Sequence, residues 1–443
     1  MKNSQKVFTG SVDKEYPTVD RAEGVYVWDT NGKKYLDCAA GVAVVNIGHG
    51  VREVRDAIYE QSKRVSYVYG STFTSEARER LAEQIISLAP RNMEKVFFCS
   101  GGSEALESVI KIARQYHLES GKPKKFKVIS RWQSYHGNTV ATLSIGGRPS
   151  WREKYDPYMS DMPHIAQCNC YRCPYRLSRE SCEYVCADEL ERVIKYEGAD
   201  TVSAFVLEPI TGTTAPAIVP PAGYMAKLRE ICDRHDVLLC MDEVITGLGR
   251  TGKNFAVDHF GVEPDLIAAA KGLGGGYVPI GAVLASSKVV DAFRKGSGNL
   301  MHSFTYAGNP VVCAGGSAVI QYLTDNRLVE ASAVKGEFFL KLLREELDDH
   351  PNVGEIRGKG LLLGLEYVLD RKTKTPFPAD RQISSRIAGY CFEKGLLVVF
   401  AVPGCADGIL GDATQISPPF TIEEADMRKA VEILGDAVRT ICI

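Results

Sequence analysis

The stretch VLLCMDEVITGLGRTGKN (Val237–Asn254) places an apolar run of strand length before an acidic pair and three glycines. The glycines, Gly247, Gly249 and Gly252, have the GxGxxG spacing of a dinucleotide-binding loop, and a lysine follows the last of them as in a nucleotide P-loop. Nucleotide binding is therefore the first hypothesis to test against the surrounding residues.

The residues around these glycines argue against a nucleotide-binding loop. In a dinucleotide-binding fold the first glycine ends the strand and a helix begins at once. Here Asp242 and Glu243 come between the strand and the glycines, and the residues after Gly252 form a poor helix pattern. A P-loop also needs Ser or Thr after its lysine to hold magnesium, whereas this chain has Asn254. Both nucleotide-binding interpretations therefore fail on context.

Other apolar runs of the same kind indicate the fold class. The runs are 95–100, 126–130, 202–209, 237–244 and the weaker 264–272. They lack polar alternation, which is typical of strands buried on both faces. Amphipathic helical patterns lie between some of them, at 104–120 and 223–236. This alternation predicts an α/β domain with a mainly parallel sheet.

The two ends of the chain have a different pattern. From about residue 330 the sequence predicts a long helix at 334–351, strands at 358–368 and 394–401, and a last helix. Thr421 and Glu424 have the spacing of a capping box for that helix. Near the N-terminus, GVYVWDTNGKKYLD (24–37) predicts a hairpin around an Asn-Gly turn.

The chain length of 443 residues exceeds what one hydrophobic core usually supports, so we expect two domains. The large domain spans residues 46–329 and holds the sheet. A small α+β domain spans residues 330–443, and the N-terminal segment 1–45 contributes to it.

Composition excludes several classes of protein. The net charge is −2, which argues against a dedicated nucleic-acid surface. We find no secretory signal and no run of about 18 apolar residues, so we expect no membrane span. Thirteen cysteines in such a chain favour reduced thiols and a cytoplasmic location.

Chemically useful groups follow the predicted strands. They are Ser100–Glu104, Glu208, Asp242 and Lys271. In open parallel sheets, ligands bind beyond the carboxyl ends of the strands, so these groups should face one crevice. A helix N-terminus binds phosphate, a lysine can form a Schiff base, and a carboxylate can hold a pyridine nitrogen in its protonated state. The set therefore predicts a site for pyridoxal phosphate (PLP).

The chain resembles the class III aminotransferases, a fold-type I group of PLP-dependent enzymes that includes ω-amino-acid and amine transaminases. The resemblance spans roughly Gly24 to Pro419. Its motifs are SGGSEALESVIKIAR, SYHGNT, VLEPITG, MDEVITGLGRTGK, PDLIAAAKGLGGGYVPIGA and SFTYAGNP. It implies a seven-stranded type of mainly parallel sheet in a large domain beside a small α+β domain.

The resemblance assigns cofactor roles to individual residues. Gly102 and Ser103, with Gly101 beside them, bind the phosphate group of PLP. Lys271 is the Schiff-base lysine, and Asp242 pairs with the ring nitrogen. The three glycines of the 247–252 turn then shape the backbone and bind no ligand.

The resemblance also assigns residues around the cofactor ring. Tyr135 stacks on the ring and His136 follows it in the same turn. Glu208 lies near the ring and Asp242, and Val244 packs on the face opposite Tyr135. Catalysis is expected from Lys271, Asp242, Tyr135 and Glu208 together. The segment Phe304–Thr305 reaches the cofactor of a neighbouring subunit, which implies a homodimer with shared active sites, or a tetramer built from such dimers.

Two positions depart from the family pattern. Many members carry an arginine for the substrate carboxylate ten residues before a Pro-Pro pair, where this chain has Gly408. Many also carry a switch glutamate where this chain has Thr213. We infer that the acid group of the substrate is recognised differently or is absent, and Arg148 is a candidate contact for it.

The sequence CNCYRCPYRLSRESCEYVC (168–186) is a second departure. Cys170 with Cys173, and Cys182 with Cys186, have a spacing that could hold zinc. The family requires no metal here, and a loop with partly buried thiols explains the same residues. We assign no metal ligand.

The expected reaction moves an amino group from an amine or an ω-amino acid (β-alanine, 4-aminobutyrate or a taurine-like compound) to pyruvate or 2-oxoglutarate. A racemase, epimerase or aminomutase on the same scaffold is the alternative, because the first half of its chemistry is shared. Small-molecule substrates are the expected partners, with neither nucleic acid nor membrane.

Overall fold

The computed structural model describes residues 5–8, 10–400 and 403–442. Its largest sheet has seven strands, as expected, in the order β4 (Met93–Cys99), β10 (Gly281–Ser286), β9 (Leu266–Ala269), β8 (Leu238–Asp242), β7 (Val202–Leu207), β5 (Lys127–Arg131) and β6 (His164–Ile165). Among these seven strands only β10 runs in the direction opposite to the others, so the mainly parallel prediction is confirmed.

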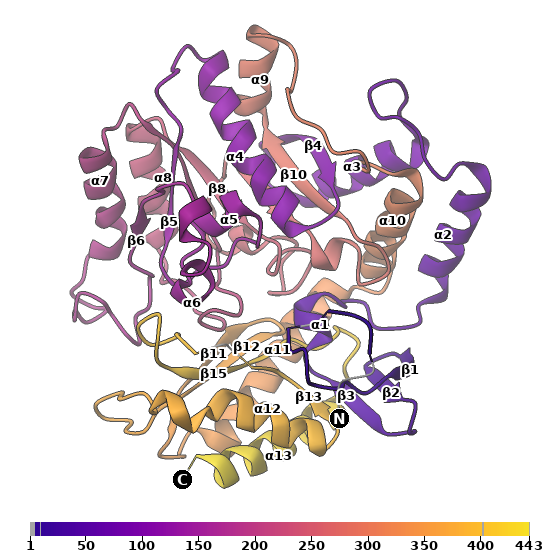
Figure 1. Ribbon diagram of the computed structural model, residues 1–443, viewed down its shortest axis with the longest axis vertical. Coiled ribbons are helices and arrows are strands. Elements are labelled where there is room, and N and C mark those ends of the chain that lie inside the picture. The colour runs from indigo at the N-terminus through magenta and orange to yellow at the C-terminus, as the bar shows by residue number, and fades with distance from the viewer. Residues whose placement is uncertain (1–4, 9, 401–402, 443) are drawn as a thin grey trace.

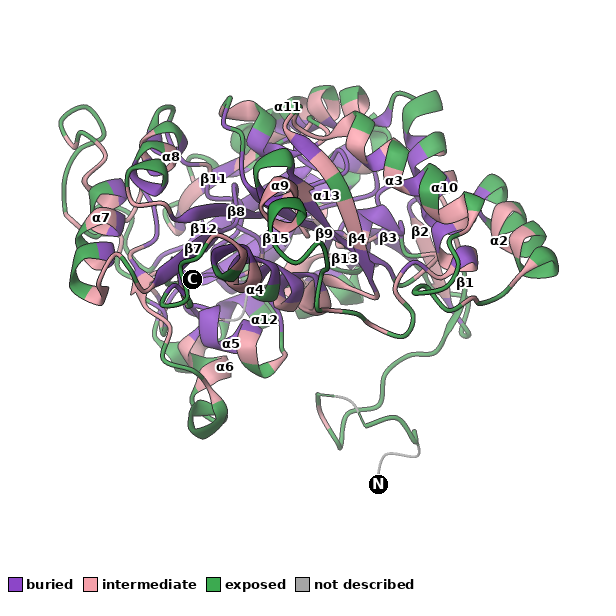
Figure 2. Cartoon of the chain, turned by 90° about the horizontal axis from the view of Figure 1, so that it is seen from above, coloured by how far each residue is buried: buried purple, intermediate pink, exposed green. Residues whose placement is uncertain are grey.

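Helices cover both faces of this sheet because alternate side chains of each buried strand point to opposite faces. In β7, Phe205 and Leu207 pack on one face, whereas Ala204 and Val206 pack on the other. The surrounding helices are α2 (Arg52–Arg64), α3 (Glu76–Leu88), α4 (Gly102–Glu119), α5 (Val140–Ile145), α6 (Pro149–Arg152), α7 (Val185–Glu197), α8 (Tyr224–Arg234), α9 (Ser287–Lys295) and α10 (Pro310–Asp325). Figure 2 shows the strands coloured as buried and the helices with exposed outer sides.

The C-terminal part of the chain forms a second layer, orange to yellow in Figure 1. Its four-stranded sheet has the order β11 (Val353–Lys359), β12 (Leu362–Tyr367), β15 (Asp412–Ile416) and β14 (Val399–Phe400). The helices α11 (Leu328–Leu347), α12 (Ile383–Glu393) and α13 (Glu424–Ile441) pack around it. They share an apolar cluster that includes Phe339, Ile387 and Leu434.

The N-terminal hairpin joins this layer. It consists of β2 (Tyr26–Asp29) and β3 (Lys34–Asp37), preceded by β1 (Val19–Glu23) and followed by the short α1 (Ala40–Ala43). The hairpin prediction is confirmed. The carboxylate of Asp29 stabilises the turn by accepting hydrogen bonds from the backbone N–H groups of Asn31 and Lys33.

Two predictions for the C-terminal layer are wrong. The strand expected at 394–401 is two short strands: β13 (Leu396–Leu397) pairs with β3, and β14 pairs with β15. The capping box of Thr421 does not form, because helix α13 begins only at Glu424. Within the described residues the Thr421 hydroxyl has no hydrogen-bond partner, and it lies against Gly48 instead.

Short 3₁₀ helices complete the chain. They are η1 (Asp156–Tyr158), η2 (Ala256–His259), η3 (Lys271–Leu273) and η4 (Ala379–Arg381). None of the described helices combines the length and the apolar character needed to cross a bilayer.

Candidate active site

The carboxyl edge of the large sheet carries the candidate site. Strand β8 ends at Asp242, Glu208 follows β7, and Lys271 follows β9 after one residue. Strand β4 ends on the same edge, because it is antiparallel to β10, which is itself antiparallel to β9. These strand ends line one cavity of about 260 Å³ together with Ser100, Gly101, Gly102, Ser103, Tyr135, His136 and Val244.

The first wall of the cavity is the N-terminus of α4. Gly101 lies before the first turn with an extended backbone, and a side chain there would meet open space. Gly102 is packed closely instead, since a Cβ there would lie 2.9 Å from a methyl group of Val244. The helix has 18 residues, so its free N–H groups and its dipole favour an anion such as phosphate.

Asp242 is the buried carboxylate of the site. One of its oxygens lies 2.7 Å from Nδ1 of His136, and the other accepts a hydrogen bond of 3.0 Å from the backbone N–H of Val244. The second ring nitrogen of His136 is buried and has no partner among the described residues. His136 therefore fixes the orientation of the Asp242 carboxylate.

Glu208 is the second buried acid at the cavity. Its Oε1 accepts a hydrogen bond of 2.9 Å from the backbone N–H of Gly212, whereas its Oε2 has no partner within the described part of the chain. Burial raises the pKa of the Glu208 carboxyl. An unpartnered, buried oxygen facing a cavity is the condition in which a bound polar group would be stabilised.

Lys271 completes the set of ionisable groups. It starts a short 3₁₀ turn with φ of 44°, a left-handed conformation that is rare for residues other than glycine. Burial lowers the pKa of the Lys271 ammonium group to about 8, although the carboxylates of Asp242 and Glu208 oppose the shift. A substantial fraction of the amine is therefore neutral near physiological pH, as a nucleophile or a base requires.

An aromatic pair lies beside these groups. Tyr135 lines the cavity, and its ring meets Trp151 edge to face with 5.4 Å between ring centroids. The guanidinium of Arg148 lies 5.1 Å from the Trp151 ring. Burial lowers the pKa of Arg148 to about 10, and the negative charges that oppose this shift come from Tyr135 and Glu208. Arg148 is therefore electrostatically coupled to the site.

The two departures from the family pattern also have a structural context. Gly408 has φ of 94°, and a Cβ at that position would lie 3.5 Å from the Pro149 ring, next to Arg148. Thr213 lies half-buried in the loop after Glu208. Gly408, where many family members carry an arginine, therefore faces the segment that contains Arg148.

Phe304 and Thr305 lie outside this cavity. Phe304 packs on His302 and Phe97 beside β4, and the exposed Thr305 accepts a hydrogen bond from Tyr67 through its carbonyl oxygen. Within one chain the structure does not bring these two residues to the other predicted site residues.

The glycines of the 247–252 segment shape a turn. Gly249 and Gly252 have φ of 96° and 84°, and a side chain at either would collide with the C-terminal layer. Gly247 packs within 2.8 Å of the Glu243 carbonyl oxygen, measured from an ideal Cβ. These contacts confirm that the glycines are turn residues packed against other parts of the chain.

Sequence analysis missed several residues of the site. Trp151 has no motif to identify it. Arg131, whose guanidinium donates to the carbonyl oxygen of Glu208, lies 77 positions from its partner. The pairing of His136 with Asp242 spans 106 positions. The only signal for these contacts was that Arg131 ends β5 just before the SYHGNT motif and that His136 lies within this motif.

The cysteine segment provides no assembled metal centre. Across the described residues, no three side chains of His, Cys, Asp or Glu are grouped so that they could hold a metal ion.

The architecture is that of the fold-type I PLP-dependent transferases, and comparison with known proteins establishes this. The ω-transaminase of Pseudomonas jessenii in complex with PMP superimposes with a TM-score of 0.90 at 34% identity, covering 96% of this chain and 94% of the other. An (S)-enantioselective ω-transaminase from Thermomicrobium roseum gives 0.90 at 36% identity, covering 97% and 93%.

The sequence comparisons define the family. The model described as aminotransferase class-III matches residues 9–438. The uncharacterized aminotransferase YodT of Bacillus subtilis is 40% identical over 96% of this chain and 96% of its own. The putrescine–pyruvate aminotransferase of Pseudomonas aeruginosa is 36% identical over 94% and 89%. The chain belongs to the class III aminotransferase family, whose members are enzymes that use PLP.

Proposed function

We propose that this enzyme transfers an amino group from an amine or an ω-amino acid to pyruvate or 2-oxoglutarate. Candidate donors are diamines, β-alanine, 4-aminobutyrate and taurine-like compounds. The observation that carries the proposal is the convergence of Lys271, Asp242 and the N-terminus of α4 on one cavity.

The residues around the cavity fit PLP. Gly101, Gly102 and Ser103 would bind the phosphate, because the α4 N-terminus offers free N–H groups beside an open position at Gly101. Asp242 would hold the pyridine nitrogen in its protonated state, with His136 fixing the carboxylate.

The rest of the cavity would enclose the cofactor ring. We assign Tyr135 and Val244 to its two faces and Glu208 to its edge, where the unpartnered Oε2 can accept a hydrogen bond.

PLP, when bound, supplies an electron sink for the substrate carbon. The chain supplies the proton transfer. We assign Lys271 Nζ as the group that attaches the cofactor and then carries the proton, because its lowered pKa leaves it able to accept one near neutral pH. Asp242 and Glu208 keep the cationic form of Lys271 accessible by opposing the effect of burial.

We further propose a homodimer in which Phe304 and Thr305 complete the site of the partner subunit. Support comes from their position beside β4, outside the cavity of their own chain, with Thr305 exposed. The division into a large domain at 46–329 and a small domain at 330–443 with 1–45 belongs to the same proposal.

The substrate class follows from Gly408 and Thr213. Without an arginine at 408, an α-carboxylate loses its usual cation, and the arginine next to that position is Arg148. We propose Arg148 as the contact for the acid group of the acceptor or of an ω-amino acid. The relatives named for putrescine–pyruvate and for γ-aminobutyrate transamination fit donors without an α-carboxylate.

A donor panel tests the proposal. The holoenzyme is assayed with putrescine, taurine, β-alanine, 4-aminobutyrate and α-amino acids against pyruvate and 2-oxoglutarate. We expect amines or ω-amino acids to exceed α-amino acids in kcat/KM by at least about tenfold. A clear preference for α-amino acids would contradict it. Substrate deuterium exchange without conversion of the cofactor to its amine form would favour an epimerase instead.

A further inference from the structure

The segment 168–186, which links β6 to α7, gathers five thiols around one small cavity. The cavity is about 20 Å³, room for roughly one water molecule. Cys168 is buried, Cys170 is exposed, and the remaining three are half-buried. All five are free thiols, and they are Cys168, Cys170, Cys173, Cys182 and Cys186.

Cys168 lies close to two of the other thiols. The sulfur atoms of Cys168 and Cys186 lie 3.8 Å apart, and Cys170 lies within hydrogen-bonding reach of Cys168. The Cys168 thiol has one proton to donate. Donated to Cys170, it lowers the pKa of that exposed thiol to about 7, and donated to Cys186, it lowers the pKa of Cys186. Either interaction raises the pKa of Cys168 itself. A thiolate is therefore available at the surface, with a protonated thiol behind it.

The arrangement favours thiol chemistry over metal binding. Among the described residues no three potential ligands are grouped for a metal ion. The Cys168–Cys186 pair, in contrast, needs to approach by only about 1.7 Å to reach the S–S bond length. Cys186 lies in the first turn of α7, and coil links Cys168 to that helix, so the chain between them can accommodate such a movement.

We propose that Cys168, Cys170 and Cys186 form a thiol–disulfide exchange site for low-molecular-weight disulfides. The Cys170 thiolate attacks one sulfur of the disulfide, so a mixed disulfide forms and one small thiolate leaves. Cys168 loses its proton to solvent and attacks the Cys170 sulfur, releasing the second small thiolate. Cys186 then loses its proton to solvent and attacks Cys168, and Cys170 returns as a thiolate. Two protein thiols are oxidised and one external disulfide is reduced to two thiols.

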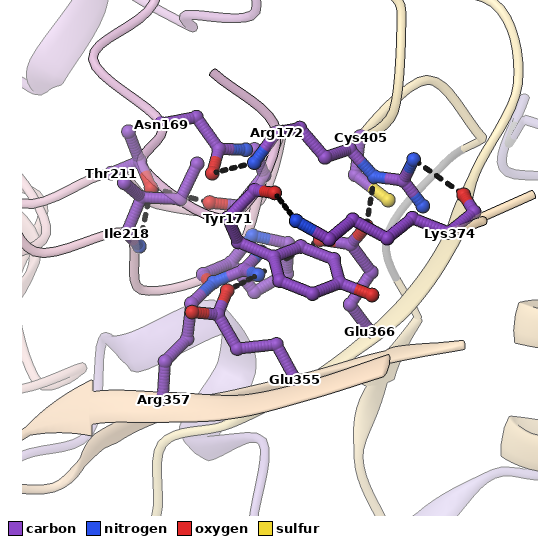
Figure 3. Close-up of polar contacts among 12 residues, drawn as sticks. Asn169, Tyr171, Arg172, Thr211, Ile218, Glu355, Arg357, Glu366, Lys374 and Cys405 are labelled. Carbon is purple, nitrogen blue, oxygen red and sulfur yellow. Dashed lines mark hydrogen bonds and ion pairs between the residues drawn. The ribbon is translucent and has the colours of Figure 1, made fainter. Parts of the chain in front are cut away.

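The residues after Cys170 connect this site to the C-terminal layer, as Figure 3 shows. Lys374 donates a hydrogen bond of 2.6 Å to the Tyr171 carbonyl oxygen, and the guanidinium of Arg172 pairs with the buried Glu366. Tyr171 also packs against Gly354, where an added Cβ would lie 2.4 Å from its hydroxyl. Movement of this segment as Cys168 approaches Cys186 therefore acts on a tightly packed junction.

The junction continues toward the candidate active site. Glu366 forms a second ion pair, of 2.8 Å, with the guanidinium of Arg357. Arg357 in turn donates a hydrogen bond of 2.8 Å to the carbonyl oxygen of Pro216, in the loop that follows Glu208. A displacement of Arg172 thus reaches the loop after Glu208 through three contacts, Arg172–Glu366, Glu366–Arg357 and Arg357–Pro216. We expect oxidation to raise KM for the amine donor while the cofactor remains bound.

Peptide mapping of the full-length holoenzyme after incubation with oxidised glutathione tests the proposal. The expected product is a Cys168–Cys186 disulfide, with two fewer titratable thiols than in the reduced enzyme. Cys170→Ser should form it about tenfold more slowly. Cys186→Ser should stop with glutathione on Cys170 or with a Cys168–Cys170 disulfide. Cys182 lines the same cavity but does not belong to the proposed site of Cys168, Cys170 and Cys186. Cys182→Ser should therefore behave like the wild type.

Two results would overturn the proposal. One is glutathione spread equally over all five cysteines, or none at any of them. The other is a purified enzyme that holds about one equivalent of zinc and whose five thiols react only after chelation. Because the map is read on wild-type protein, the test does not depend on whether the buried Cys168→Ser variant folds. Because it is independent of turnover, its failure is distinguishable from failure of the proposed transamination.

Discussion

Two glycine-rich segments follow strands at the same edge of the large sheet, and they serve different purposes. At Gly101 an added side chain would meet open space before the first turn of α4. At Gly252 an added side chain would lie 2.7 Å from Ala333 of α11. The first segment leaves room for a ligand, and the second brings the sheet edge into contact with the C-terminal layer. Glycine spacing alone therefore does not separate a binding loop from a packing turn.

The largest expected effect distinguishes two lysines. Lys271 lies beside the ligand site, and Lys253 directly follows the packing turn. Lys271→Ala should lower kcat by at least about 10³-fold, because it removes the amine that holds the cofactor and moves the proton. Lys253→Ala changes an exposed side chain directly after the 247–252 turn, and it should leave kcat within about twofold of the wild type. Steady-state kinetics and borohydride trapping of the pyridoxyl group on residue 271 measure both. Equal losses of kcat in the two variants would contradict the different roles assigned to the two lysines.

Two acids on either side of the 247–252 turn, Asp242 and Asp258, give the next largest effect. Asp242→Asn should reduce kcat about 10²-fold or more, because a neutral amide cannot stabilise a protonated pyridine nitrogen. Asp258→Asn changes a carboxylate that accepts a 3.2 Å hydrogen bond from the backbone N–H of Phe255, outside the cavity, so it is the matched control. Its kcat should stay near the wild-type value. If Asp242→Asn retained full activity, the assignment of the ring-nitrogen partner would fail.

Substitution of one glycine in each segment tests the comparison through the free energy of unfolding. Gly252→Ala should cost about 2–4 kcal/mol of unfolding free energy, because it combines a left-handed backbone with a collision against α11. Gly101→Ala should cost about 1 kcal/mol or less, since its backbone is extended and its surroundings are open. It should instead weaken cofactor binding. Urea unfolding and PLP titration separate the two effects. A Gly101→Ala variant that loses stability but not PLP affinity would reverse the interpretation.

The sequence predicted those parts of the molecule that depend on local pattern. Five of the strands of the large sheet follow from unbroken apolar runs. Strand β10 was missed, because GAVLAS consists largely of small residues, and its antiparallel direction has no local signal. Thr421 has the right spacing to cap α13, but burial of Phe420 and Ile422 draws the segment into the core and the helix begins later.

The candidate site shows the same limit. Its motifs are local, so their residues could be named in advance, and the cavity brings most of them together. Contacts between distant segments could not be named. The His136–Asp242 hydrogen bond and the approach of Gly408 to Pro149 depend on how the C-terminal layer and the β5 loop meet the sheet edge. The spacing of residues along the sequence gives no information about how these segments approach one another.

The smallest expected effect is a pH dependence that only the buried lysine should produce. The pKa of Lys271 is about 8 in the folded chain and about 10.4 when unfolded. Between these values the unfolded chain binds more protons than the folded chain, so the free energy of unfolding rises with pH. Below about pH 8 both states are protonated, and the cost of the buried charge is fully present.

Lys271→Met removes this titration, so the stability of the apoenzyme relative to this variant should increase from pH 8 to pH 10. Urea unfolding of both proteins at several pH values measures the difference. Lys253→Met is the control, because the Lys253 side chain is exposed, and it should give curves parallel to the wild type. Parallel curves for Lys271→Met as well would mean that water reaches Lys271 freely. The cavity would then not lower its pKa, and the base assigned to proton transfer would remain protonated at neutral pH.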